Sequence, residues 1–541
     1  MGDGRADRGD ADAEPTGSRR QPARGNERPF RLVEVLAALS LASDLARGRP
    51  DGEAMRACLL ATELGREVGL KGGDLAAAYW TTLLRFVGCT GTSHEYALTF
   101  GGDDIAVRRG GDLVDAARPR EGIAFVTSLT RGRPPLARAR LLLTTLPRAQ
   151  ATVRAAAAAD CEVGALMARR CALDAAVERG LREMFERWDG QGSPRGLSGD
   201  AIAVASRVAT VAYVGVIFAS EGGPDLARAA IGRWSGRALD PAIAAAFQRR
   251  TRDLLDLTEP DDPWTAVVAA EPDPPRFIEA DRLDEVAETF GEAVDLKAPF
   301  LAGHSQGVAH LAEAAGRALG VTDEGATRLR RAGHLHDLGR VGVATGTWER
   351  RDPPSRMEWE RIRLHPYRTE RILAVAPALA DLARLAGSHH ERLDGSGYHR
   401  AVPAAMLDLP ARILAAADVF QALTSARPHR PAVSAAAAAA TMRGLPLDRD
   451  AVGAVLDAGG VRAPRPTADW PAGLTDREVQ VLRLLVEGRT EKAVASMLVV
   501  APSTVHTHVV HLYEKAGVTT RAGAAMFAMA HDLVGRGPEI H

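Results

Sequence analysis

Residues 334–343 read HLHDLGRVGV, and they lie within a series of histidines and aspartates that decides the fold of this chain. The members of the series are His304, His336, Asp337, His365, His389, His390 and Asp418. Successive members or adjacent pairs are 24 (365 to 389) to 32 (304 to 336) residues apart, which is about one helix plus its turn. The spacing predicts a helical bundle whose successive helices bring ligands to one interior point.

The chemistry of these side chains predicts a metal centre. Imidazole together with carboxylate suits iron, manganese or zinc. Seven ligands are too many for one tetrahedral ion, but they suit two ions that share a bridging carboxylate. Fourteen of the 15 histidines follow residue 300, and only His94 precedes it.

Length and composition bound the rest of the chain. The 541 residues are enough for roughly three domains. A net charge of −1 gives no overall attraction to nucleic acid or to an anionic membrane, so any such binding needs a local surface. The four cysteines form no CxxC pair, which favours a reduced cytoplasm. Residues 1–28 are polar and predict disorder rather than a signal peptide, and no apolar stretch is long enough to span a membrane.

Two segments rich in proline and acidic residues, 259–276 and 463–472, predict domain boundaries. Elsewhere alanine, leucine and arginine recur at helical spacing, which predicts an all-helical fold. The expected units are a disordered N-terminus at 1–28, a first half at 29–258, a linker at 259–278, a second half at 279–462, a linker at 463–472 and a C-terminal domain at 473–541.

The first half is a distant copy of the second. Residues 185–214 align with residues 390–419 without a gap, at an offset of 205, and both segments contain the turn ER-x-DG-x-G. Upstream, GREVGL at 65–70 matches GRALGV at 316–321 at an offset of 251. The difference of 46 (251 minus 205) predicts an insertion of that size between Gly88 and Asp160. A shared turn is not produced by composition bias alone, so an internal repeat is the better interpretation.

The repeat predicts which half is active. Where the second half has its seven ligands, the first half has, in the same order, Glu53, Arg85, Phe86, Asp160, Met184, Phe185 and Tyr213. This set has lost every histidine and cannot hold the same centre. The first half is therefore expected to be a packing partner, or a sensor whose pocket prefers something uncharged.

HLHDLGRVGV and HHERLDGSGY (389–398) resemble the HD-GYP branch of the HD phosphohydrolases. The likeness extends from GHSQGVAHLA at 303–312, through LHP at 364–366, to ADVFQALTSARPHR at 417–430. It implies a helical bundle in which His304, His336, Asp337 and Asp418 bind one ion and His365, His389 and His390 bind the other, with Asp337 as bridge. Iron or manganese is the implied metal, and cyclic di-GMP is the family's usual substrate.

Three arginines are candidate phosphate ligands. Arg340 follows the HD pair by one turn, on what we expect to be the same helix face, and its guanidinium can donate two hydrogen bonds to a phosphate. Arg427 and Arg430 follow the last metal ligand by roughly three turns. A surface ion pair is the alternative role for Arg340. We assign catalytic roles to Asp337 and Arg340.

Some positions depart from the family pattern. The chain has Arg340 where lysine is common and Gly397-Tyr398-His399 in place of GYP. Phe300 stands where members with three metals carry a glutamate, which favours two ions. The segment after the HD pair is altered to ATGTWERRDPPS at 344–355. These changes lie around the substrate loop rather than the ligands, so the substrate is less well defined than the metal centre.

Residues 474–525 resemble the LuxR-type helix-turn-helix. Thr475 and Glu478 predict a capping box for the first helix. A helix at about 490–498, a turn through Val500–Pro502 and a recognition helix from Ser503 to about Lys515 form the expected motif. The candidate base contacts are Ser503, Thr504, His506, Thr507 and His508, and Lys515 and Arg521 are the candidate phosphate contacts.

The charge of this domain leaves a second role open. Six basic residues between 474 and 534 are balanced by six acids, His506 stands where relatives carry Lys or Arg, and Glu491 stands where they carry Asn. Phosphate neutralisation supplies most DNA affinity, so the domain must bind weakly or as a homodimer. A protein-interaction module is the alternative.

Together these features predict a cytoplasmic bacterial regulator with DNA and a nucleotide or cyclic dinucleotide as partners, and with no membrane. It would combine a two-metal phosphodiesterase with transcriptional control. The alternative is a non-enzymatic regulator whose metal pocket senses a nucleotide and changes the disposition of the DNA-binding domain.

Overall fold

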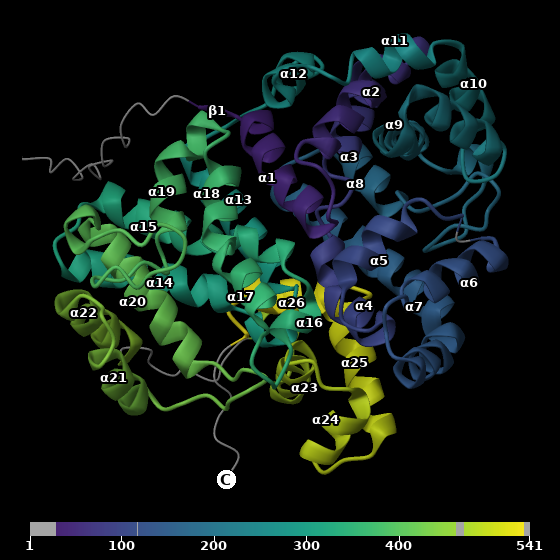
Figure 1. The fold of residues 1–541 in the computed structure, drawn as a ribbon. Helices are drawn as coiled ribbons and strands as arrows, with labels where there is room; N and C mark the ends of the chain where they lie inside the picture. The colour runs from purple at the N-terminus through teal and green to yellow at the C-terminus, as the bar shows by residue number, and fades with distance from the viewer. Residues whose placement is uncertain (1–28, 116, 461–469, 535–541) are drawn as a thin grey trace, which may run out of the picture.

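The computed structural model describes residues 29–115, 117–460 and 470–534, and it is almost entirely helical, as predicted. Figure 1 shows the two halves side by side, with the C-terminal helices beneath their junction. One hydrophobic core runs through both halves, and a second core fills the C-terminal domain. The predicted disorder of residues 1–28 and most of the predicted linker at 463–472 lie outside the described residues.

The first half begins with a short strand and continues as helices. Its elements are β1 (Phe30–Arg31), α1 (Leu32–Ala46), α2 (Glu53–Glu67), α3 (Gly72–Leu83), α4 (Ser93–Phe100), α5 (Asp104–Gly111), α6 (Pro119–Ser128), α7 (Pro135–Arg170), α8 (Ala175–Arg182), α9 (Val204–Trp234), α10 (Pro241–Arg249), α11 (Thr251–Asp256) and α12 (Pro263–Ala270), with 3-10 turns η1 (Cys89–Thr92) and η2 (Gly199–Ala201).

The second half has the same general plan. Its elements are β2 (Phe277–Ile278), α13 (Ala280–Asp295), α14 (His304–Ala318), α15 (Asp323–Leu335), α16 (Thr345–Trp348), α17 (Arg356–Arg363), α18 (His365–Leu373), α19 (Ala380–Gly387), α20 (Leu409–Thr424), α21 (Ala435–Arg443) and α22 (Arg449–Gly460), with 3-10 turns η3 (Pro299–Leu301), η4 (Leu338–Gly342), η5 (Pro377–Leu379) and η6 (Ala404–Met406). The strands β1 and β2 pair antiparallel, so the two halves join where each begins.

The C-terminal domain has the four helices expected of a LuxR-type module. They are α23 (Asp476–Val486), α24 (Glu491–Met497), α25 (Pro502–Ala516) and α26 (Arg521–Ala530), preceded by the turn η7 (Pro471–Gly473). Thr475 and Glu478 form the predicted capping box. Pro502 occupies the first turn of α25, where its missing N–H costs nothing, so the recognition helix begins one residue earlier than expected.

Matched contacts in the two halves support the internal repeat. Glu186 accepts a hydrogen bond from the backbone N–H of Leu197, and Glu391, 205 positions later (391 minus 186), accepts one from Val402. Upstream, Asp44 and Asp295, 251 positions apart (295 minus 44), each accept hydrogen bonds from the first turn of the following helix, α2 or α14. These offsets are the ones that the sequence alignment predicted. The domain boundaries themselves stay predictions.

The predicted linker at 259–278 is wrong as a description of local structure. It contains α12, which packs against α1 and α2, and the strand β2. Asp262 caps α12, Pro263 occupies its first turn, and Val267 is fully buried. Aspartate followed by proline is a helix-start signal, and here it outweighs the breaking tendency of the surrounding prolines.

Within the described residues, one helix, α9, is long and apolar enough to cross a membrane by length and composition, and the sharply bent pair of α24 and α25 passes the same test only if it is counted as one span. Two thirds (67%) of the most apolar stretch of α9 is buried inside the bundle, and its helical geometry breaks at Gly222 and Gly223. These are features of a core helix in a globular protein.

The C-terminal domain docks on both halves through α26. Glu162 of α7 is buried, and its carboxylate accepts hydrogen bonds from the backbone N–H and hydroxyl groups of Thr519 and Thr520, at the start of α26. At the other end, Gln306 Nε2 of α14 donates to the carbonyl oxygen of Met529, at 3.2 Å. The C-terminal domain therefore contacts α14 in the turn that begins with His304.

Candidate metal centre

All seven predicted ligands meet in one interior cluster. Six of them lie at or next to a helix end, and Asp418 lies inside a helix. His304 is the first residue of α14, His336 and Asp337 directly follow α15, His365 begins α18, His389 and His390 follow α19, and Asp418 lies within α20. All are buried except His390, whose side chain is 15% exposed. The close packing of His365 against the HD pair requires a glycine at position 339, because a Cβ there would lie 2.0 Å from the carbonyl oxygen of His365. The HD-x-G motif thus lets α18 pack directly against the turn after α15.

Asp337 lies between two sets of histidines. Its Oδ2 is 3.5 Å from His304 Nε2 and 3.3 Å from His336 Nε2. Its Oδ1 is 3.2 Å from His365 Nε2 and 3.6 Å from His389 Nε2. One carboxylate therefore has one oxygen facing each set, which is the arrangement a bridging ligand needs.

Asp418 completes both sides of the cluster. Its Oδ1 is 3.3 Å from His304 Nε2, and its Oδ2 is 3.7 Å from His390 Nδ1. Three groups have ligand atoms that lie within 4.8 Å of one another: His304 with His336 and Asp418, His336 with Asp337 and His389, and His365 with His389 and His390. These buried clusters are consistent with metal binding in HD-GYP phosphodiesterases.

The backbone fixes the orientation of three imidazoles. The Nδ1 atoms of His336, His365 and His389 lie 2.6 to 2.7 Å from the carbonyl oxygen three residues earlier, which acts as acceptor. Protonation of Nδ1 leaves each Nε2 with a free lone pair toward the cluster, which is the usual second contact of a ligating histidine. Among the described residues, no hydrogen-bond partner reaches His304 Nε2, His336 Nε2 or Asp337 Oδ1. Buried nitrogen and oxygen atoms that have lone pairs but no hydrogen-bond partner are suitable ligands for two divalent transition-metal ions.

Four ligands are held in the protonation states that metal binding requires, whereas burial is outweighed at His336 by the charge of Asp337, which raises the pKa of that imidazole until a metal ion displaces its proton. Burial and neighbouring histidines hold the pKa values of His389 and His390 well below the ordinary value, so both imidazoles are neutral. Burial would raise the pKa of Asp337, but the charges of Arg340 and His336 hold it well below its usual range. Burial likewise opposes the ionisation of Asp418, yet contacts with His304 and His390 hold its pKa well below normal. Both carboxylates are ionised.

The three candidate phosphate ligands differ in their surroundings. The prediction that Arg340 lies on the same helix face as the HD pair is wrong, because α15 ends at Leu335 and Arg340 lies in the 3-10 turn η4. Its Nη2 is 2.8 Å from Asp337 Oδ2, so it lies at the centre itself. Burial and the charge of Arg340 lower the pKa of Arg427 to about 10, and the Arg427 guanidinium lies 5.2 Å from the centroid of the Phe300 ring. Arg430 instead donates to backbone carbonyl oxygens of Leu423 and Ala422 at the end of α20.

Two aromatic residues beside the cluster were quoted from the sequence without a predicted role. Tyr398 stacks on His390 with ring centroids 4.2 Å apart, and Arg363 donates a hydrogen bond to the carbonyl oxygen of Tyr398. Trp348 lies with its ring 5.9 Å from that of His365 and with the Arg340 guanidinium 4.7 Å from its ring centroid. A tryptophan inside the altered segment 344–355 is the signal that could have identified this position.

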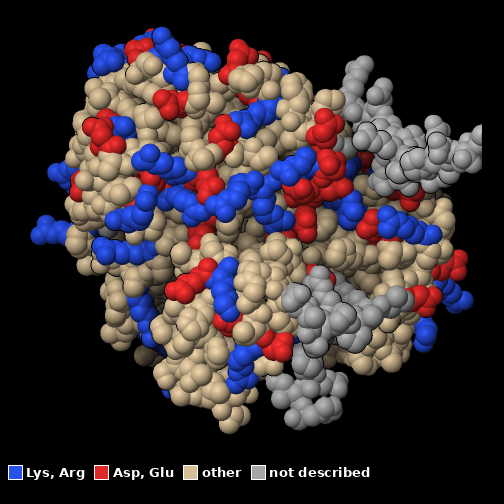
Figure 2. Space-filling view, turned by 180° about the vertical axis from the view of Figure 1, so that it is seen from behind, with Lys and Arg blue, Asp and Glu red and all other residues tan. Residues whose placement is uncertain are grey.

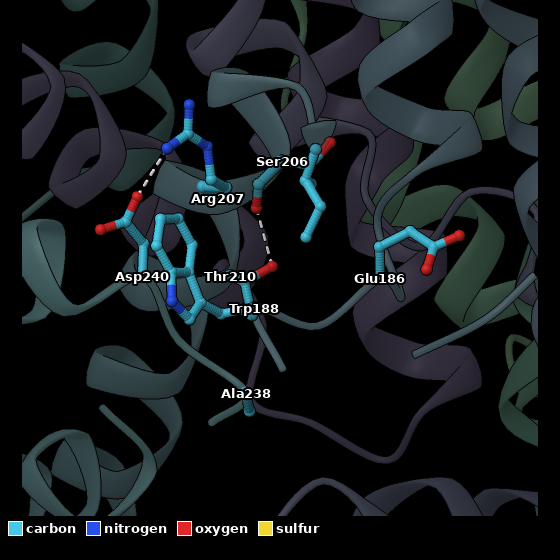
Figure 3. A pocket seen from close by; sticks show the side chains of 8 residues that line it. Glu186, Trp188, Ser206, Arg207, Thr210, Ala238 and Asp240 are labelled. Carbon is cyan, nitrogen blue, oxygen red and sulfur yellow. Dashed lines mark hydrogen bonds and ion pairs between the residues drawn. The ribbon is translucent and has the colours of Figure 1, made fainter. Parts of the chain in front are cut away.

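In the first half, charged and aromatic side chains fill the matching position. The Arg47 guanidinium lies 3.3 Å from the centroid of Phe86 and contacts Tyr213 and Asp112, and burial lowers the pKa of Arg85 to about 10. A pocket for something uncharged was therefore a wrong expectation, because buried arginines and acids replace the ligands. Figure 3 shows a small cavity nearby, where Arg207 pairs with Asp240 and Thr210 donates to the Ser206 carbonyl.

The recognition helix α25 has an open face. A shallow hollow is lined by Ser503, Thr504, Thr507, His508 and His511, of which the last was not predicted. His506 Nδ1 is 3.2 Å from Glu491, and Lys515 pairs with Glu478 of the capping box. Burial lowers the pKa of Arg521, which lies at the docking interface. In Figure 2 the lobe of the C-terminal helices, at the bottom, has few charged side chains, whereas charged residues gather across the middle of that face.

Comparisons with known proteins agree with this architecture. A model of the HD domain matches residues 288–448, and a model of the LuxR family of bacterial regulatory proteins matches residues 472–528. The chain is 30% identical over 409 residues to 3'3'-cGAMP-specific phosphodiesterase 3 of Vibrio cholerae, a match that covers 75% of this chain and 88% of that protein. It is 32% identical over 154 residues to the cyclic di-GMP phosphodiesterase response regulator RpfG of Xanthomonas campestris, covering 28% of this chain and 41% of that protein.

A solved structure shares most of the fold. The crystal structure of a cyclic GMP-AMP-specific phosphodiesterase of Vibrio cholerae aligns with a TM-score of 0.56 at 26% identity. The alignment covers 81% of this chain and 99% of that one.

Proposed function

Because this chain belongs to the HD-domain phosphohydrolases related to the cGAMP and cyclic di-GMP phosphodiesterases and ends in a LuxR-family helix-turn-helix, we propose that it is a cytoplasmic regulator that hydrolyses a cyclic dinucleotide and binds DNA. The observation that carries the proposal is Asp337, which faces one set of histidines with each carboxylate oxygen. The match over most of the chain favours 3'3'-cGAMP over cyclic di-GMP as substrate.

The ligand assignment follows this geometry. His304, His336, Asp337 and Asp418 would hold one divalent iron or manganese ion, and His365, His389 and His390 would hold a second ion that Asp337 shares. When bound, the two ions supply Lewis-acid chemistry and a nucleophile for in-line attack on phosphorus.

The chain's own residues contribute charge and position. Arg340 lies within 2.8 Å of Asp337, so its guanidinium reaches a phosphodiester at the centre and offsets the negative charge that develops on the phosphoryl oxygens. The half-buried Arg427, which the charge of Arg340 also influences, adds to the same positive field. In the reaction, water forms a bond to phosphorus, the bond from phosphorus to the ribose 3' oxygen breaks, and that oxygen takes a proton to give a linear dinucleotide.

DNA binding is assigned to the open face of α25. Its small polar and imidazole side chains suit contacts with base edges in the major groove. Lys515 is paired and Arg521 is half-buried, which leaves few cations for phosphate, so we expect weak binding by one chain and tighter binding by a homodimer on two half-sites.

A second candidate is a sensor that binds a nucleotide without turnover and reports to the helix-turn-helix. The observation in its favour is the contact between Gln306 of α14 and Met529 of α26, which joins the helix of His304 to the DNA-binding module.

The deciding experiment is a turnover assay on anaerobically purified full-length chain loaded with Fe²⁺ or Mn²⁺. We expect about two ions per chain and hydrolysis of 3'3'-cGAMP or cyclic di-GMP, and Asp337→Ala should remove most of both ions and lower turnover roughly 100-fold or more. Asp323→Ala, at a fully exposed position in α15, is the matched control and should change neither. Binding of the nucleotide without hydrolysis would favour the sensor. A wild-type chain without bound metal would refute both.

A further inference from the structure

The segment Thr345–Trp348, which forms α16, lies between the candidate metal centre and the first half. The backbone N–H of Thr345 donates to Asp104 Oδ1 at 2.7 Å, and the backbone N–H of Gly346 donates to the carbonyl oxygen of Gly102 at 2.9 Å. A Cβ on Gly346 would lie 2.6 Å from atoms of Gly102, so the two backbones are in direct contact. The first half thus holds the backbone of a loop that borders the site of the second half.

Asp104 also fixes a second segment of that site. Its Oδ2 lies 2.9 Å from Nζ of Lys297, and both side chains are 0% exposed. Burial opposes the ionisation of Asp104, but the charge of Lys297 lowers the pKa of Asp104 below the ordinary value, so Asp104 is ionised. A buried pair of this kind is stable only with both partners in place. Because Lys297 precedes His304 by seven residues (304 minus 297), Asp104 ties the segment that leads to α14 to the segment that begins α16.

Trp348 is the residue of this loop that borders the centre. The Arg340 guanidinium lies over its ring, with 4.7 Å from Cζ to the ring centroid. Its ring meets that of His365 edge to face, at an interplanar angle of 78°. The indole Nε1 is buried, and no described residue accepts a hydrogen bond from it. A buried tryptophan N–H ordinarily has an acceptor, so this donor is available to a ligand.

We propose that Trp348 is a substrate-contacting residue of this site, with its indole N–H donating to a phosphodiester oxygen of the bound cyclic dinucleotide, and that Asp104 of the first half is the residue that positions it. The inference rests on the proposed function. Arg340 and His365, the two neighbours of the ring, both belong to the groups that would surround the phosphate, which makes a phosphodiester oxygen the acceptor within reach. The ring itself keeps the Arg340 guanidinium in place by a cation–π contact.

The test compares two substitutions that remove different parts of the side chain. Trp348→Phe keeps a ring for Arg340 but removes the N–H, whereas Trp348→Ala removes both. We expect Trp348→Phe to keep two ions per chain and to lose about 10-fold or more in kcat/KM on the cyclic dinucleotide, since a hydrogen bond to a charged group is lost. Trp348→Ala should lose more. Wild-type values for Trp348→Phe would overturn the contact.

The matched control is Trp264→Phe in α12. Trp264 Nε1 donates to the carbonyl oxygen of Glu34 at 3.1 Å, so the control also removes one indole hydrogen bond, but far along the chain from the centre. It should leave kcat/KM unchanged.

The role of Asp104 is tested by a double-mutant cycle. Replacing both buried charges, Asp104→Leu with Lys297→Met, avoids an uncompensated charge and keeps the chain folded. In that double variant the segment Thr345–Trp348 is no longer held by Asp104, so adding Trp348→Phe should lower kcat/KM by less than about 2-fold. The penalties overlap because Asp104 and Trp348 act through the same segment. An undiminished penalty would refute the positioning role of Asp104.

Calorimetric titration with 3'3'-cGAMP separates this inference from the proposed hydrolysis. If wild type binds the nucleotide without hydrolysing it, and binds it about 10-fold more tightly than Trp348→Phe does, the contact stands and only the proposed hydrolysis falls. Equal affinity of the two chains overturns the contact whether or not wild type is active.

Discussion

At the scale of residues, the ligands of the candidate centre are predictable because metal chemistry restricts them to a few side chains at helical spacing. All seven histidines and aspartates that the sequence singled out lie in one cluster. The surroundings of Arg340 were not predictable in the same way. The direction of the Arg340 side chain depends on where α15 ends. Arg340 lies in the 3-10 turn η4, and the conformation of this turn is set by the close packing of Gly339 on His365.

His334, just before the HD pair, gives a prediction about pH. It is buried in α15, and burial, with the charges of His310 and Arg330, lowers its pKa to about 3. In the unfolded chain a histidine titrates near ~6.5. Below that pH the unfolded chain binds a proton that the folded chain does not, so the free energy of unfolding falls as pH drops, by up to about 1.4 kcal/mol per pH unit.

His334→Leu should therefore flatten the dependence of unfolding free energy on pH between about 6.5 and 5. The measurement is urea denaturation of chelator-treated protein at several pH values. An unchanged slope in the variant would show that His334 does not titrate differently in the folded and unfolded chains.

At the scale of elements, the repeat explains why one half has the candidate metal ligands and the other does not. Gly88 and Gly339 each allow the backbone of a later helix to pack closely. A Cβ on Gly88 would lie 2.2 Å from the carbonyl oxygen of Asp160, and a Cβ on Gly339 would lie 2.0 Å from that of His365. The helix packing is thus retained while the ligands are replaced. Sequence alignment could predict this correspondence, but not the stack of Arg47 on Phe86, because Arg47 belongs to no matched motif.

Phe86→Ala in the first half should lower stability without affecting the metal. The ring is 7% exposed and contacts Tyr213 and Phe185, so its removal should cost about 3–5 kcal/mol of unfolding free energy. Metal per folded chain should stay at the wild-type value, as measured by elemental analysis of the folded fraction. Metal bound by an isolated fragment of residues 29–258 would mean that the inactive half was misassigned.

At the scale of the whole molecule, the docking of α26 joins three units that the sequence presents as separate. The LuxR-type module was predictable from its motifs, and the two helices of the helix-turn-helix, α24 and α25, begin and end close to the expected residues. Its docking was not predictable, because Glu162 lies in no motif and aligns with the exposed residue Tyr367 of the second half (367 minus 162 is 205).

Glu162→Ala should loosen the C-terminal domain without disturbing the centre. It removes the acceptor of four hydrogen bonds at the start of α26, so we expect faster amide hydrogen exchange in residues 519–530 and unchanged metal content. Glu178→Ala is a suitable control, since Glu178 pairs with Arg169 and Arg182 within the first half. Equal exchange in both variants would show that Glu162 does not hold the domain.

The contact of Gln306 with Met529 has a thermodynamic consequence. Gln306 and His304 lie in the same helical turn, so under the proposed function DNA on one side and nucleotide on the other would act on a common element. Linkage between two binding equilibria is reciprocal. If the cyclic dinucleotide changes the affinity for DNA by some factor, DNA must change the affinity for the cyclic dinucleotide by the same factor, and an occupied operator then becomes an effector of the phosphodiesterase.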